Sequence, residues 1–365
     1  LACAYVLCVP PMIFRGRLRM TSALRAALAA VAISAVALLA ACADAPPPPP
    51  PAPPPPPPVA LAPKLIEQAS AYRYYVNRSS AISPTFTDGT SIAEALRTGV
   101  AYEPKQLMQG ATAYGAIVAL QDPAFVAGVR SYGSSPETRR QIANSIIQDP
   151  AYVVAMAGSN SAAGLVIAAL AADGNRFYEA GKAVKQSAYD VQKQSWSKAE
   201  VANREMRLIQ AKSLSATPVV GDIAETARLQ SATAGTASLG LTAAPAPPPF
   251  TPVVIRSLAV AALSVLGEAT DANLETINAV MFEPNTGMCV NMAKLNLYQC
   301  LAVSKPHYED IFCLGQHAMM DTARCVIKAS GQPEPFEARF IPRVAAASEV
   351  GYTPTSAKKK PSKKR

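Results

Sequence analysis

Four cysteines near the C-terminus have the residue type and spacing to do chemistry. Cys289, Cys300, Cys313 and Cys325 fall within 37 residues of one another. An even number of clustered cysteines in an exported chain is typical of a disulfide framework. Cys289 and Cys300 are eleven positions apart, about three helical turns, and Lys305-Pro306 then interrupts the helix. Of the three possible pairings, an antiparallel helical hairpin therefore favours Cys289 with Cys325 and Cys300 with Cys313.

The second half of this hairpin fits less simply. Cys313 and Cys325 are twelve positions apart, which leaves them about 120° from a common face of an α-helix. We expect either that Gly315 bends the helix or that Cys325 lies beyond its end. The pattern is similar to the twin-cysteine helical hairpins of the CHCH family, although ten and eleven residues separate the cysteines here. This likeness concerns architecture and implies no shared function.

The same region offers a metal site as an alternative. His317 follows Cys313 at a plausible ligand spacing, and thiolate, thioether and imidazole together suit Cu(I) or zinc. The nearby methionines are Met281, Met288, Met292, Met319 and Met320. However, no Cys-x-x-Cys is present, and methionine commonly fills gaps in small cores. We therefore predict disulfides, no metal and no cofactor, and keep periplasmic copper or zinc binding as the alternative.

A signal segment precedes the body of the chain. Met20, the expected start, opens a short basic region, and the apolar run that follows is shorter than the ~20 residues that span a bilayer. The run ends in Leu39-Ala40-Ala41-Cys42, which resembles the lipobox of bacterial lipoproteins. The resemblance implies cleavage before Cys42, acyl chains on Cys42 and a membrane anchor outside the cytoplasm. Because Ala43 rather than Asp comes next, lipoprotein sorting favours the outer membrane, facing the periplasm, over the inner membrane.

Two other readings of this segment remain open: an uncut signal anchor, and ordinary cleavage after Ala43. Residues 1–41 are thus assigned to the upstream sequence and signal peptide, and residues 42–63 to the anchor and a proline-rich stalk. The stalk runs from Pro46 to Pro58 and should form an extended polyproline II helix, roughly 40 Å long. A proline-rich ligand for a recognition domain is the competing interpretation.

The net charge of +9 is concentrated at the two ends of the chain. Four arginines before residue 42 and six of the last eight residues supply ten positive charges, so residues 42–357 carry a net charge of −1. This distribution argues against a broad nucleic-acid-binding face. The basic positions at the end are Lys358, Lys359, Lys360, Lys363, Lys364 and Arg365. We expect residues 336–365 to be a disordered tail that contacts an acidic envelope surface, or one that has no partner.

The composition favours an all-α fold. Half of the residues are hydrophobic with alanine dominant, and only 6% are aromatic. Asp122-Pro123, Ser135-Pro136 and Asp149-Pro150 mark helix starts, since Asp and Ser cap free amides and Pro suits the first turn. The first and third of these lie in a Gln-Asp-Pro-Ala repeat with an offset of 27 residues. A single polar helix is expected from Gly174 to about Ser213, with small residues along one face for close packing.

Prolines and small residues divide the body into two parts. We predict a helical domain over residues 64–230, a linker over 231–250 that is rich in Ala, Thr, Gly and Pro, and a cysteine-containing helical domain over 251–335. A new helix is expected from Val253 to Leu266.

No residue pattern identifies an enzyme. The chain has two histidines, His307 and His317, and lacks hydrolase, metalloprotease, P-loop and dinucleotide-binding motifs. We predict a lipid-anchored envelope lipoprotein with a structural or protein-interaction role, held to the membrane through Cys42, with an unidentified protein partner and no nucleic acid. Copper or zinc binding is the first alternative. A cell-wall hydrolase, which would need paired carboxylates that a sequence cannot reveal, is the second.

Overall fold

The helix starts predicted from the Pro-containing pairs are present. The Asp122 side chain accepts a hydrogen bond from the Phe125 amide at the start of α5 (Pro123–Tyr132). Ser135 caps α6 (Pro136–Gln148) in the same way. Asp149 instead caps η1 (Pro150–Ala155), a 3₁₀-helix, so the two copies of the Gln-Asp-Pro-Ala repeat begin different structures. The chain then turns at Gly158, whose φ of +83° suits glycine, and α7 begins at the next residue.

The computed structural model describes residues 59 and 61–337, and the all-α fold predicted from composition is confirmed. The signal segment, Cys42, the proline-rich stalk and the basic tail from Lys358 to Arg365 lie outside the described residues. Within the described part, no helix is both long enough and apolar enough to cross a bilayer. The remaining elements are α2 (Pro63–Ser80), α3 (Gly89–Val100), α4 (Pro104–Ala119), α7 (Ser159–Asp190), η2 (Val191–Lys193), α8 (Ser195–Lys198), α9 (Arg204–Ala216), α10 (Ile223–Thr233), α11 (Pro252–Val265), η3 (Asp271–Asn273), α12 (Leu274–Met281), α13 (Pro284–Val303), α14 (His307–Cys313), η4 (Leu314–Asp321) and α15 (Thr322–Ser330).

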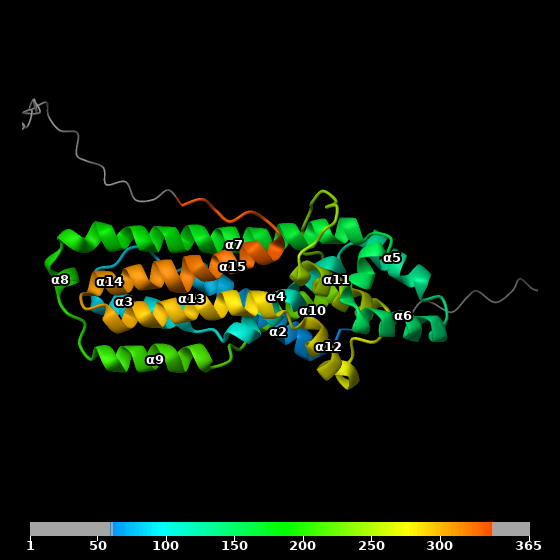
Figure 1. Cartoon of the computed structure of the whole chain (residues 1–365), viewed down its shortest axis with the longest axis horizontal. Coiled ribbons are helices and arrows are strands. Elements are labelled where there is room, and N and C mark those ends of the chain that lie inside the picture. Colours follow the sequence, from blue (N-terminus) through cyan, green and yellow to red (C-terminus); the bar gives the residue numbers. More distant parts are fainter. Residues whose placement is uncertain (1–58, 60, 338–365) are drawn as a thin grey trace, which may run out of the picture. The chain divides into compact units, whose positions relative to one another are not determined.

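These helices pack side by side around one continuous core (Figure 1). The long helix α7 extends along one side, and α14, η4 and α15 pack along it. Helix α9 lies on the opposite side, with α13 and α3 between. Towards the other end, α11 packs against α4, and α4 packs against α2.

The segments on either side of residues 231–250 share this core. Helices α4 and α11 come from different segments, and both are buried along most of their length. The amide of Ala62 donates to the Ala269 carbonyl at 2.7 Å, which joins the start of α2 to the end of the α11 region. The intervening stretch crosses α7, where the Ala246 amide donates to the Asn160 carbonyl at 2.9 Å. It therefore packs against the body as part of the fold.

The single helix predicted from Gly174 to about Ser213 is wrong. α7 ends at Asp190, and the chain reverses through η2 and α8 before α9 begins. Asn203, just before α9, has a φ of 54°, a left-handed conformation that a continuous helix does not allow. The expected row of small residues does exist on α7. A Cβ on Gly181 would lie 2.7 Å from the Met319 Cβ, so glycine there lets η4 approach closely.

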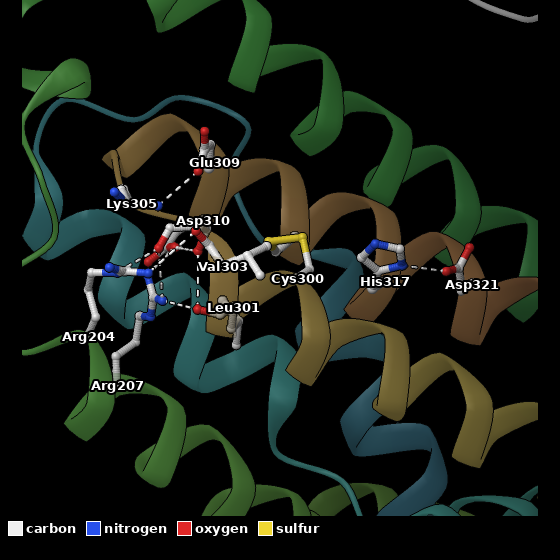
Figure 2. Close-up of a disulfide and its surroundings, with 12 residues drawn as sticks. Arg204, Arg207, Cys300, Leu301, Val303, Lys305, Glu309, Asp310, His317 and Asp321 are labelled. Atoms are coloured by element: carbon white, nitrogen blue, oxygen red, sulfur yellow. Dashed lines mark hydrogen bonds and ion pairs between the residues drawn. A yellow bond between two sulfur atoms is a disulfide. The ribbon is translucent and has the colours of Figure 1, made fainter.

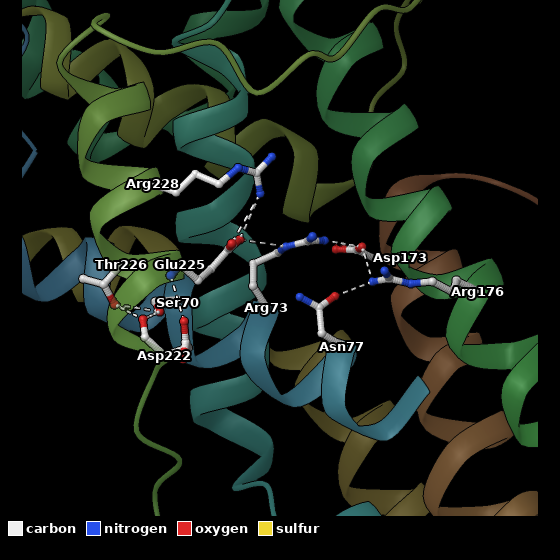
Figure 3. A network of polar contacts seen from close by, with 9 residues as sticks. All are labelled: Ser70, Arg73, Asn77, Asp173, Arg176, Asp222, Glu225, Thr226 and Arg228. Carbon is white, nitrogen blue, oxygen red and sulfur yellow. Dashed lines mark hydrogen bonds and ion pairs between the residues drawn. The ribbon is translucent and has the colours of Figure 1, made fainter. Parts of the chain in front are cut away.

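A buried polar network ties α2 to α7 and α10 (Figure 3). The Arg73 guanidinium pairs with Asp173 of α7 and, at 3.3 Å, with Glu225 of α10. Arg176 also pairs with Asp173, at 3.1 Å, and binds the Asn77 side chain at 2.7 Å. Because breaking a buried pair leaves an uncompensated charge, the network fixes how these three helices fit together.

Candidate functional site

The four C-terminal cysteines form the two predicted disulfides. Cys289 pairs with Cys325 and Cys300 pairs with Cys313, with Cα–Cα distances of 5.8 and 5.7 Å. Both bridges join α13 to the chain that returns along it. The arrangement is the disulfide-stapled helical hairpin expected from the spacing.

A π-helix resolves the poor fit of the second pair of cysteines. η4 occupies eight residues between Cys313 and Cys325. Its i→i+5 turns hold more residues than α-helical turns, so each residue rotates the chain through a smaller angle. Over these eight residues the smaller rotation removes the offset of about 120° that an α-helix would leave between Cys313 and Cys325. The expected bend at Gly315 is thus replaced by a change of helix type. Gly315 also permits close contact, since a Cβ there would clash with the Lys185 backbone of α7.

The only charged residue of α13, Lys294, points into the core. Its Nζ donates to the Val100 carbonyl at 2.5 Å and to the Ser215 Oγ at 2.7 Å, and lies 3.4 Å from the centre of the Tyr102 ring. Burial lowers the pKa of the Lys294 ammonium well below its ordinary value, and the Glu103 carboxylate opposes that shift. The side chain thereby attaches α13 to the ends of α3 and α9.

Two arginines hold the C-terminal end of α13 (Figure 2). The Arg204 Nε donates to the Ser304 carbonyl at 2.8 Å, and Arg207 donates to the Leu301 carbonyl, so both satisfy carbonyls that a helix end leaves free. Arg207 also pairs with Asp310 of α14. Burial raises the pKa of the Asp310 carboxyl, although Arg207 acts in the opposite direction. α9, α13 and α14 are therefore joined next to the Cys300–Cys313 bridge.

With Lys294 turned inwards, the outer face of α13 carries no charge. Six of its exposed positions repeat every three or four residues, the spacing of a coiled-coil seam, and Pro284, Asn291 and Val303 are exposed beside them. The residues of this α13 seam are Asn285, Met288, Met292, Leu295, Gln299 and Ala302. Met288, Met292 and Leu295 are 65%, 49% and 46% exposed.

An apolar groove of about 460 Å³ borders the same face. Met108 and Met281 line it together with the exposed Phe282 and the apolar side chains of the α13 seam. Contiguous apolar surface of this kind marks interaction sites, and flexible methionine side chains suit such surfaces.

Comparisons with protein-family models, with curated proteins and with solved structures give no match. The inference of function therefore depends on the geometry of the chain itself.

The residues of the alternative metal site do not converge. All four cysteines are in disulfides and supply no thiolate. Met319 and Met320 are buried in the core, whereas Met288 and Met292 are exposed on α13. His317 Nδ1 is hydrogen-bonded to Asp321 at 2.8 Å. Across residues 61–337, no group of three or more His, Cys, Asp or Glu side chains is placed to hold a metal ion.

The sequence was sufficient to predict the two disulfides but not the α13 seam. Part of the signal was present, because Lys294 is the one charged residue between Pro284 and Val303 and the six seam positions follow a heptad spacing. A sequence does not reveal which face of a helix is turned to solvent, and α13 is apolar on much of its inner face as well.

Proposed function

We propose that this chain is a lipid-anchored structural protein of the bacterial envelope that self-associates through the α13 seam. The observation that carries the proposal is an exposed, uncharged and regularly spaced helix face on a disulfide-stapled hairpin. The lipobox-like Leu39-Ala40-Ala41-Cys42 and the proline-rich stalk support the tethered location. The tail ending at Arg365 supplies positive charge for an acidic surface.

The α13 seams of two antiparallel copies of the chain are complementary to each other. A two-fold axis between Met292 and Leu295 pairs Met292 of one copy with Leu295 of the other. The same axis pairs Met288 with Gln299 and Asn285 with Ala302. No charge meets a like charge in this register, and a two-fold interface requires such self-complementarity. Chains confined to one membrane surface also meet at high effective concentration, so a modest contact is sufficient.

The test is cross-linking in cells of the full chain with a photoreactive amino acid in place of Met292. A product of twice the monomer mass supports the proposal. A product of any other mass would identify a different partner for the seam and overturn self-association. For a matched measurement, Leu295→Glu should abolish the double-mass product, whereas Ile223→Glu, at an 88% exposed position on α10, should leave it unchanged.

The anchor needs a separate measurement, because self-association does not depend on it in principle. Metabolic labelling with a fatty-acid analogue should mark the wild-type chain and leave Cys42→Ala unmarked. Equal absence of label from both chains would exclude the lipoprotein assignment.

The two alternative functions have weaker support. Copper or zinc binding through the cysteines requires free thiols, whereas all four are paired. A cell-wall hydrolase of the usual glycosidase type requires two carboxyl groups facing the substrate. The groove between α3 and α9 has one carboxylate, Asp310, among its lining residues. The groove beside the α13 seam has two, Glu103 and Glu283, and each of them caps the start of a helix.

A further inference from the structure

A second groove lies between α3 and α9, away from the α13 seam. It has a volume of about 640 Å³, within the ~300–1,000 Å³ range of small-molecule sites. Its apolar lining comprises Ile92, Leu96, Val100, Met206, Ile209 and Leu214. Met206 and Ile209 are 61% and 56% exposed on its rim, so an apolar occupant would remove them from water.

The charged groups and the histidine of this groove stand at two places, and Asn203, Gln210 and Ser213 of the α9 side add uncharged polar groups. Near Gly89, the His307 ring and the buried Arg207–Asp310 pair form one end. Arg97 lies eight residues after Gly89 on α3, which places it about 12 Å further along the groove. This spacing places Arg97 and the His307 end on either side of Ile92, Ala93 and Leu96 of α3.

The charge of the groove favours an anion at Arg97. Arg97 is exposed, and its guanidinium has no ion pair or hydrogen bond to another side chain among residues 61–337. Asp310 is the only carboxylate among the lining residues, and its charge is offset by Arg207 and by a 2.8 Å hydrogen bond from the Ser304 Oγ. The Arg97 cation is therefore left uncompensated beside the apolar lining.

We propose that this groove binds a single-chain anionic amphiphile of the fatty-acid type. The carboxylate pairs with Arg97, and the alkyl chain lies between α3 and α9 and extends towards His307. An anionic head explains the unpaired cation, and an alkyl chain explains the apolar lining and the exposed rim. The groove is separate from the α13 seam, so the two proposals stand or fall independently.

The test is calorimetric titration of the delipidated full chain with dodecanoate and with dodecanol, both below their aggregation concentrations. Dodecanoate should bind about tenfold more tightly than dodecanol, a difference of about 1.4 kcal/mol, because only the carboxylate can pair with Arg97. Arg97→Gln should remove that preference, whereas Arg140→Gln, at an exposed arginine of α6, should retain it. Ile209→Glu should lower the affinity for both ligands, and Ile223→Glu should lower the affinity for neither.

Three results would overturn the proposal. The first is the absence of saturable binding of dodecanoate by the wild-type chain. The second is equal affinity for acid and alcohol, unaffected by Arg97→Gln. The third concerns the source of the ligand: clearly tighter binding by Cys42→Ala than by wild type would identify the chain's own acyl groups as the occupant.

Discussion

Removing the two disulfides separately should destabilise the protein by different amounts. The bridge Cys289–Cys325 spans 36 residues, and Cys300–Cys313 spans 13. In the chain-entropy description, a longer closed loop restricts the unfolded chain more strongly. That relation gives about 4 kcal/mol for the 36-residue loop and about 3 kcal/mol for the 13-residue loop.

The comparison is well matched because each bridge joins one partly exposed and one buried cysteine. Cys313 and Cys325 are both buried, and Cys289 and Cys300 are both partly exposed. The packing lost in the double alanine variants should therefore nearly cancel. The expected outcome is that Cys289→Ala/Cys325→Ala is about 1 kcal/mol less stable than Cys300→Ala/Cys313→Ala.

Urea unfolding followed by far-ultraviolet circular dichroism would measure both variants without reductant. Wild-type protein treated with dithiothreitol provides the control, since with both disulfides reduced it should be less stable than either variant. Equal losses, or a larger loss from the 13-residue loop, would refute the entropic reasoning. Free thiols holding stoichiometric metal in protein from its native host would refute the staple assignment itself.

Three further outcomes are expected. The unfolded chain binds more protons than the folded chain between the lowered pKa of Lys294 and its ordinary value of 10.5, so wild-type stability should rise with pH there. Lys294→Met should remove up to ~1.4 kcal/mol per pH unit of that rise, measured by urea unfolding at several pH values. Asp122→Ala should lower the free energy of unfolding by about 1–2 kcal/mol, because α5 loses its N-terminal cap. Thermal unfolding measures this loss, with Asp149→Ala as the comparison variant. Gly164→Ala should lower stability by about 1–3 kcal/mol in calorimetry, since the new Cβ would strike the Ala244 carbonyl. Stabilisation, as expected for an open helix position, would contradict that contact.

Local signals in the sequence predicted local structure well. Asp122 and Ser135 could be assigned as caps because capping depends on residues within one turn. The cysteine pairing was also accessible, since the Lys305-Pro306 break and the two spacings define a hairpin. The π-helix η4, which packs against α7, was not, because it has no residue signature of its own.

The missed features depend on distant contacts. The reversal between Asp190 and Arg204 is held in part by the hydrogen bonds of Arg204 to the end of α13, a hundred residues later in the chain. The groove at Arg97 likewise needs α3 and α9 to be side by side. A local pattern does not reveal such neighbours, and residues 191–203 contain no Gly or Pro that would mark the break.

The hydrogen bond between Ala62 and Ala269 joins segments that are made far apart in time during synthesis. The earliest helix of the body, α2, and its neighbour α4 share a core with α11, which ends about two hundred residues later. A partly synthesised chain lacks that partner and leaves the apolar surface of α4 uncovered, and the core that α2 and α4 enter extends to Ala329 of α15. The apolar faces that α2 and α4 bury in this core therefore lack some of their partners through most of synthesis.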